Sequence, residues 1–149
     1  MPDKETLEKA HEDEREGKSP STQAGEFVRE EIEHIREGKH GARSTKQAIA
    51  IGLSKARRAG VKLPAPKKGK VSSRTREQVA RDVRKGRSGS VRRVSATRSR
   101  AVSRALAREG HRAASKKALS RQARGAAAKR SKASRSQTAK KAAATRKQR

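Results

Sequence analysis

The chain has 149 residues and a formal net charge of +27, with 42 Lys and Arg residues against 15 Asp and Glu. Only 18 of its residues are Leu, Ile, Val or Phe, a fraction well below the ~20% under which highly charged chains tend to be disordered. This composition excludes one large hydrophobic core for the whole chain. The lack of cysteine excludes disulfides and thiolate metal sites.

The charge is distributed unevenly along the chain. Residues 1–37 hold 12 of the 15 acidic residues, whereas residues 38–149 hold 36 of the 42 basic ones. Such asymmetry predicts a polyanion-binding body with an acidic N-terminal segment. The first residues are too acidic for a signal peptide, and no run of ~18 apolar residues is present. We therefore expect a soluble, cytoplasmic protein with no membrane partner.

The N-terminal third predicts an all-α module. We expect an acidic flexible segment at 1–20 and a helical hairpin at 21–63. The first helix is predicted from Ala24 to Glu37, with Val28, Ile32 and Ile35 as its apolar stripe. Phe27 is expected at the edge of the stripe. The glutamates at 26, 30, 31, 33 and 37 are expected on the other, solvated faces.

The second helix of the predicted hairpin is basic. It is expected to begin at Ser44, because Ser44 followed by Gln47 fits a capping box, and to end before Gly60. Ile49 and Leu53 are expected to form its apolar stripe together with Ala56, flanked by Ala48, Gly52 and Ala59. An acidic helix followed by a basic helix predicts packing with complementary charge.

The rest of the chain predicts weaker structure. Residues 64–74 form a basic linker rich in Pro and Gly, and residues 75–124 resemble a degenerate, Ala- and Arg-rich repeat of the hairpin. The repeat is expected to consist of a helix over 75–85 and another around 95–108, both weak without a partner. Residues 125–149 have the low-complexity composition of a disordered cationic tail.

Nothing in the sequence favours an enzyme. The four histidines match no metalloprotease or zinc-finger spacing, and no nucleophile and base are arranged for catalysis. Glu30 and His34 are spaced i, i+4, with Glu37 and His40 nearby, but such a set is more often a solvated helix face. We therefore predict no catalytic residue, no metal site and no cofactor.

The predicted function is nucleic-acid binding through phosphate contacts. The turn before Ser44 suits an anion, because a helix N-terminus offers backbone N–H groups and a partial positive charge. An equally simple interpretation is that Gly38 and Ser44 only cap two helices. The candidate nucleic-acid-binding residues are Lys39, Arg43, Ser44, Thr45, Lys46, Lys55, Arg57, Arg58, Arg92, Arg93, Lys116, Lys117, Lys129, Arg130, Lys140 and Lys141.

Duplex DNA is the favoured partner. The chain has one Phe and no Tyr or Trp, so it lacks the aromatic residues that stack on single-stranded bases. The predicted turn is long for a DNA-reading helix-turn-helix, which favours contacts of low sequence specificity. Two alternatives stay open: an RNA- or ribosome-associated protein, and a protein-interaction scaffold in which the hairpin forms a homo-oligomer.

One stretch resembles a known family. "SPSTQAGEFVREEIEHIREGKHGARSTKQAIAIGLSKARRAGVKLP" (19–64) is similar to a bacterial family of small basic proteins defined by a domain of unknown function. The last segment resembles the Lys- and Ala-rich tails of histone-H1-like bacterial nucleoid proteins. The resemblance implies a bacterial nucleoid setting and brings no catalytic residues.

Overall fold

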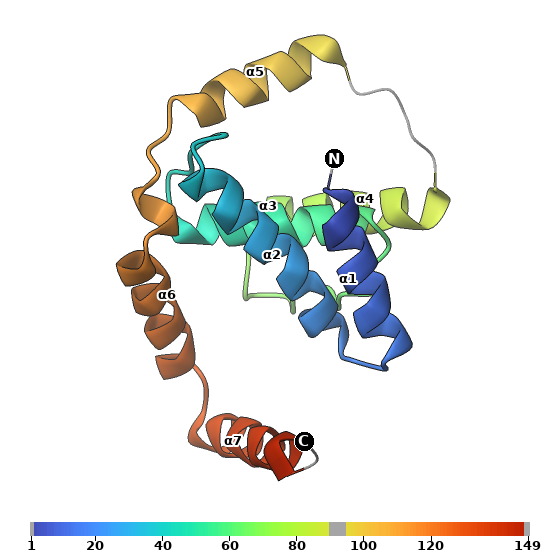
Figure 1. Cartoon of the computed structure of the whole chain (residues 1–149), viewed down its shortest axis with the longest axis vertical. Helices are drawn as coiled ribbons and strands as arrows, with labels where there is room; N and C mark the ends of the chain where they lie inside the picture. The colour runs from blue at the N-terminus through green and yellow to red at the C-terminus, as the bar shows by residue number, and fades with distance from the viewer. Residues whose placement is uncertain (1, 90–94, 148–149) are drawn as a thin grey trace. The chain divides into compact units, whose positions relative to one another are not determined.

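The structure is a computed structural model that describes residues 2–89 and 95–147. Within them the chain is all-α, as predicted, with seven α-helices and one short 3-10 helix (Figure 1). The chain divides into two compact units, the first ending at Ala114 and the second beginning at Ser115.

The predicted hairpin is the centre of the first unit. It consists of α2 (Pro20–Arg36) and α3 (Thr45–Arg58), which pack side by side (Figure 1). α2 begins earlier than expected, because Ser19 caps it and Pro20 takes the first helical position, where its missing N–H costs nothing. Gly38 follows α2 with φ +78°, and the N–H of Lys39 donates to the His34 carbonyl, which closes the helix end.

The buried face of α2 differs from the predicted stripe. Ala24, Phe27 and Ile35 are fully buried, and Glu31 lies in the same row with 1% exposure. Of the predicted stripe, Ile32 and Ile35 are buried as expected, whereas Val28 is only half-buried. The helix is rotated toward Phe27, so the prediction that Phe27 lies at the edge is wrong. The prediction of solvated positions for Glu30 and Glu31 is also wrong, because both are buried.

The buried face of α3 is shifted in the same way. Its fully buried residues are Ala48 and Ala56, with Gly52 buried between them, while Ile49 and Leu53 are half-buried. A Cβ added at Gly52 would lie 2.7 Å from the Val28 Cα. Small residues therefore line the contact because the α2 backbone approaches too closely for larger ones.

The acidic N-terminal segment is a helix that covers the hairpin. α1 (Lys4–Arg15) packs against α2, and its Ala10 joins Phe27 and Ala56 in the core, with Leu7 packed against them. The flexible segment expected at 1–20 therefore differs from the structure. Leu7 and Ala10 are too few for a helical pattern in the sequence, but they bury because Phe27 offers them an apolar surface.

Two more helices complete the first unit. α4 (Ser73–Ser88) packs against α3, burying Val79 and Asp82, and α5 (Ala96–Ala107) has no buried residue. The short 3-10 helix η1 (Arg112–Ala114) packs against both α2 and α3. α4 and α5 correspond to the two helices expected for the degenerate repeat.

The second unit contains α6 (Lys116–Ala128) and α7 (Lys132–Lys147). Neither helix has a buried residue among those the structure describes. The disorder expected over 125–149 in the isolated chain stays a prediction. Helices without tertiary packing are marginal in water, so any helix here depends on its Ala-rich composition or on a partner.

Candidate nucleic-acid interface

The turn between α2 and α3 is covered by a later part of the same chain. The N–H of Gly41 donates to the Leu106 carbonyl at 2.9 Å, and the N–H of Ala42 donates to the Gly110 carbonyl at 3.1 Å. A Cβ at Gly41 would overlap the Glu109 carbonyl. The close backbone approach that this glycine permits is therefore used by residues 109–110.

The polar groups at the start of α3 are also bonded within the fold. Ser44 Oγ accepts the Gln47 N–H at 3.2 Å, as the capping box predicts, while the Gln47 side chain accepts the N–H of Arg43. Thr45 is buried and its hydroxyl donates to the Ala113 carbonyl at 2.6 Å. Ser44 thus caps the helix and Thr45 anchors η1, which supports the simpler of the two interpretations of this turn.

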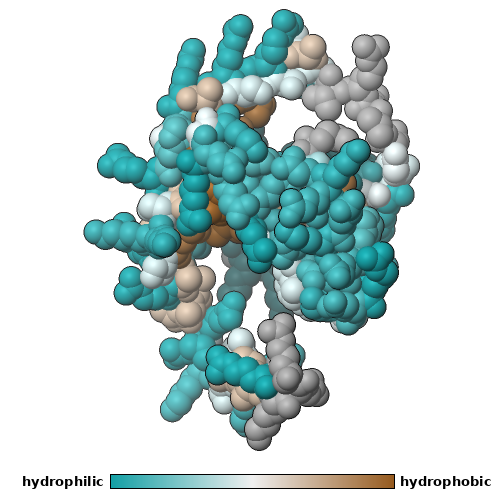
Figure 2. Space-filling model, viewed as in Figure 1, coloured by the Kyte–Doolittle hydropathy of each residue, from teal (hydrophilic) through white to brown (hydrophobic). Residues whose placement is uncertain are grey.

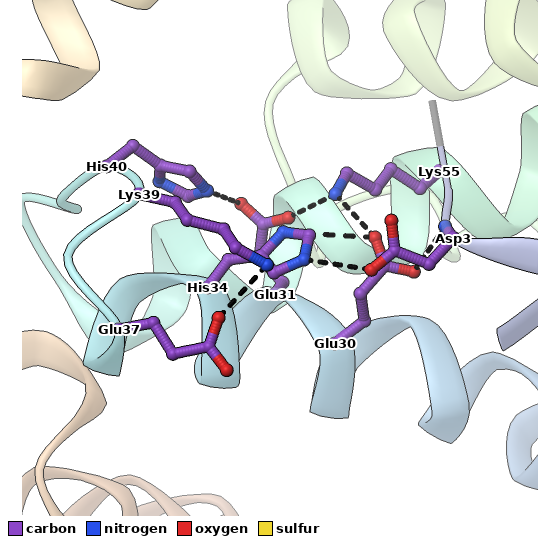
Figure 3. A network of polar contacts seen from close by, with 8 residues as sticks. All are labelled: Asp3, Glu30, Glu31, His34, Glu37, Lys39, His40 and Lys55. Atoms are coloured by element: carbon purple, nitrogen blue, oxygen red, sulfur yellow. Dashed lines mark hydrogen bonds and ion pairs between the residues drawn. The ribbon is translucent and has the colours of Figure 1, made fainter. Parts of the chain in front are cut away.

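Lys55 points into the hairpin and neutralises two buried acids. Its ammonium lies 3.0 Å from Glu30 Oε1 and 2.7 Å from Glu31 Oε2 (Figure 3). Burial lowers the pKa of Lys55, but the hydrogen bonds to Glu31 and Glu30 outweigh it and hold this pKa above its ordinary value. Lys55 is therefore part of the packing between α2 and α3.

The two arginines at the end of α3 face α4. Arg58 donates from Nε to Asp82 Oδ1 at 2.8 Å, and Asp82 also accepts from Ser54 Oγ at 2.7 Å and from Gln78 Nε2 at 3.1 Å. Arg57 is half-buried, and burial lowers its pKa. These contacts attach α4 to the hairpin.

The remaining candidates lie on the surface. Lys46 is exposed, Lys39 is paired with Glu37 at 3.0 Å, and the Arg43 side chain is 83% exposed with Glu109 at 3.7 Å. The candidates of the second unit are all exposed, namely Lys116, Lys117, Lys129, Arg130, Lys140 and Lys141. Arg92 and Arg93 lie outside the described residues.

The hairpin with its connecting turn coincides with a segment found in other proteins. Residues 15–68 match a family of unknown function, DUF6496. The match begins at the end of α1 and includes α2, the turn and α3, which agrees with a domain of unknown function over 19–64. No curated protein and no solved structure matches the chain. None of the helices among the described residues is long and apolar enough to cross a membrane.

The sequence pattern missed two structural polar residues. Glu31 was expected on a solvated face and Asp82 was not identified, yet both are among the largest fully buried side chains. Residues 38–149 contain only three acids, of which α4 carries Glu77 and Asp82, and the sequence does not distinguish the buried Asp82 from the exposed Glu77. For Glu31 no signal distinguished it from its exposed neighbours.

Proposed function

We propose that this protein binds nucleic acid, with duplex DNA as the preferred form, without enzymatic activity and with low sequence specificity. The binding is electrostatic and directed at phosphates, as in nucleoid-associated or histone-like proteins of bacteria. The contacts come chiefly from exposed Lys and Arg residues outside the hairpin, and the hairpin serves as the folded scaffold.

The observation that carries the proposal is the unbalanced charge of the second unit. Residues 115–149 contain 13 Lys and Arg residues and no Asp or Glu. All of those whose side chains the structure describes are exposed. A solvated surface of ordinary proteins mixes both signs, so this excess indicates a polyanionic partner.

The aromatic content favours a duplex over a single strand. The one Phe of the chain, Phe27, is fully buried in the core, and there is no Tyr or Trp. No Phe, Tyr or Trp side chain is therefore exposed for stacking on unpaired bases, which is a main source of affinity in single-strand binders. Figure 2 shows a face that is mostly hydrophilic, as expected for a surface that meets phosphates.

The charges of the hairpin divide into two groups. Lys55 and Arg58 are paired with acids within the fold, so removing them changes stability first. Arg43 and Lys46 are exposed and lie at the start of α3, where the helix dipole adds positive potential. These two are the ordered phosphate contacts that we propose for the hairpin.

The test is a binding series with duplex DNA, structured RNA and heparin across salt concentrations. The change of Lys129, Arg130, Lys140 and Lys141 to Gln should lower the log–log salt slope by about 0.9 for each phosphate that the variant no longer neutralises. The change Arg43→Ala with Lys46→Ala should weaken binding and leave the helical signal intact. Lys4 is an exposed cation on the acidic α1, so Lys4→Gln is the matched control and should change neither the binding nor the helical signal.

Each outcome distinguishes the alternatives. Preference for structured RNA over duplex DNA favours the RNA- or ribosome-associated alternative, and equal affinity for all three ligands indicates generic polyanion binding. Full DNA affinity and an unchanged salt slope in the tail variant contradict the proposal. A chain that binds no polyanion but forms stable homo-oligomers favours the scaffold.

A further inference from the structure

Two histidines and several acids gather at the C-terminal end of α2. His34 comes from α2 itself, and His40 comes from the turn that follows, so that the two imidazole centres lie 6.3 Å apart (Figure 3). Glu31, from the buried row of α2, lies with them. Ligand atoms of Glu31, His34 and His40 are all within 4.8 Å of one another.

The hydrogen bond of His40 fixes which of its nitrogens faces the acid. His40 Nδ1 lies 3.1 Å from the Gly41 carbonyl oxygen, and a carbonyl only accepts, so Nδ1 carries a proton. In the neutral ring Nε2 then presents its lone pair to Glu31 Oε1 at 3.2 Å. Two lone pairs at this distance require a proton on one of the two atoms or a metal ion between them.

The same arrangement is typical of metal-bound histidine. Such histidines donate their other N–H to a carbonyl or carboxylate, which orients the ring. In a tetrahedral site with bonds of about 2.0–2.1 Å, neighbouring ligand atoms are about 3.3 Å apart, close to the separation of His40 Nε2 and Glu31 Oε1. The ligand atom of His34 lies within 4.8 Å of both of these atoms, so the His34 ring has to move toward them to reach the same spacing.

Lys55 leaves the required oxygen of Glu31 available. Its ammonium contacts Oε2, whereas Oε1 faces His40. His34 Nε2 lies 3.2 Å from an oxygen of the exposed Asp3 side chain, and its Nδ1 lies 4.0 Å from Glu30 Oε1, so one of these two contacts gives way when His34 binds the ion.

The charge of the surrounding network also suits a divalent ion. Its carboxylates are Asp3, Glu30, Glu31 and Glu37, and its ammonium groups are those of Lys39 and Lys55 (Figure 3). With neutral imidazoles, four carboxylates and two ammonium groups leave two negative charges, which one divalent cation balances. Burial of Glu31 raises the cost of leaving such charge uncompensated.

We infer that Glu31, His34 and His40 bind one divalent first-row transition-metal ion, for which Zn²⁺ is the natural probe. Two imidazole nitrogens and one carboxylate oxygen form a donor set that Zn²⁺ takes in proteins, with a fourth position for water. The ion joins the turn to α2, next to the place where residues 106–110 contact that turn. This site is independent of the proposed nucleic-acid binding.

The decisive measurement uses the untagged full chain with ¹⁵N-labelled histidine rings and no nucleic acid. One equivalent of Zn²⁺ should shift the ring ¹⁵N resonances of His34 and His40, and leave that of His11 unchanged. In competition with a chromophoric chelator, His34→Gln or His40→Gln should weaken Zn²⁺ binding at least about tenfold. His11→Gln, on the exposed surface of α1, is the matched control and should bind as the natural chain does.

Several results overturn the inference. One is the absence of any ring shift on the natural chain, a test that needs no variant to fold. Another is a shift of His11 equal to that of His34 and His40, which indicates nonspecific surface binding. Unchanged affinity in a folded His40→Gln variant, with its helical circular dichroism retained, also contradicts it.

Discussion

The contact between α3 and α4 gives the sharpest prediction of stability. Asp82 is 1% exposed and accepts hydrogen bonds from Ser54, Arg58 and Gln78. Asp82→Ala removes the acceptor from all three donors at once. α4 should then separate from α3 more often, since only Val79 is otherwise buried on this helix.

The magnitude follows from the exposure of the three donors. A hydrogen bond to a charged group contributes about 1.5–3 kcal/mol, and an unpaired buried donor costs a similar amount. Gln78 is exposed and the Arg58 side chain is 48% exposed, so water replaces most of the hydrogen bonding that these two had with Asp82. We therefore expect the free energy of opening of α4 to fall by about 2–4 kcal/mol in total. Most of this decrease comes from the hydrogen bond that Ser54 loses and from the loss of the carboxylate itself.

Hydrogen exchange measured by mass spectrometry on peptides covering 73–88 is the suitable assay. A decrease of about 2–4 kcal/mol corresponds to exchange of these amides about 30- to 1000-fold faster, whereas amides of α2 should change little. Glu77→Ala, at an exposed acid on the same helix, is the matched control. Equal exchange in the two variants would refute the role of Asp82.

Three further predictions concern the hairpin and the tail. Gly52→Ala should destabilise the first unit by about 1–3 kcal/mol in urea denaturation, because its Cβ meets the α2 backbone, whereas Gly25→Ala, with nothing within 4 Å, should stabilise by up to about 1 kcal/mol. Burial raises the pKa of Glu30, but hydrogen bonds from Lys55 and Thr6 hold this pKa below its ordinary value of 4.5. The stability that this carboxylate provides is therefore present above pH 4.5 and disappears as the pH falls through its lowered pKa. Thermal melts from about pH 6 to 3 should show this loss as a decrease in melting temperature, and the decrease should be smaller in Glu30→Gln. A peptide of residues 115–149 should show little helix by circular dichroism in buffer and gain helix when duplex DNA is added; full helicity without DNA would contradict the predicted disorder.

The packing of α1 decides how the acidic N-terminal segment should be tested. Deletion of residues 1–17 is the direct way to ask whether this segment weakens DNA binding by competing for the basic body. Because Ala10 and Leu7 belong to the core, such a deletion also removes packing from Phe27. Glu8→Gln with Glu12→Gln changes charge on the exposed face of α1 and keeps the packing, so it separates the two effects.

Local signals in the sequence were sufficient for the two helices of the hairpin. The caps at Ser44 and Gly60 and the composition around them depend on neighbours within a few residues, and the helix between them forms where these signals place it. The class of the fold and the hairpin followed from the same local rules. The excess of Lys and Arg, and the partner class that we propose from it, also depend on composition alone.

Tertiary structure decided which face of each helix is buried. The apolar pattern of α2 and α3 is compatible with more than one rotation, and the close approach at Gly52 selects the one that buries Phe27 and Glu31. Only that rotation makes Lys55 an internal partner instead of a surface cation. From its sequence neighbours alone, a charged residue is predicted to be exposed. Its burial depends on residues that are distant in sequence.

Contacts between residues distant in sequence also decide which cations are paired within the fold and which lie on the surface. Residues 106–114 contact the turn before α3 from more than 60 positions away in sequence, so no local pattern announced that Thr45 would be bonded to Ala113. Residues 115–149 contain no Asp or Glu, and those of their Lys and Arg side chains that the structure describes are exposed. Sequence therefore determined the charge available to a partner, and the tertiary structure decided which of those charges the fold uses for itself.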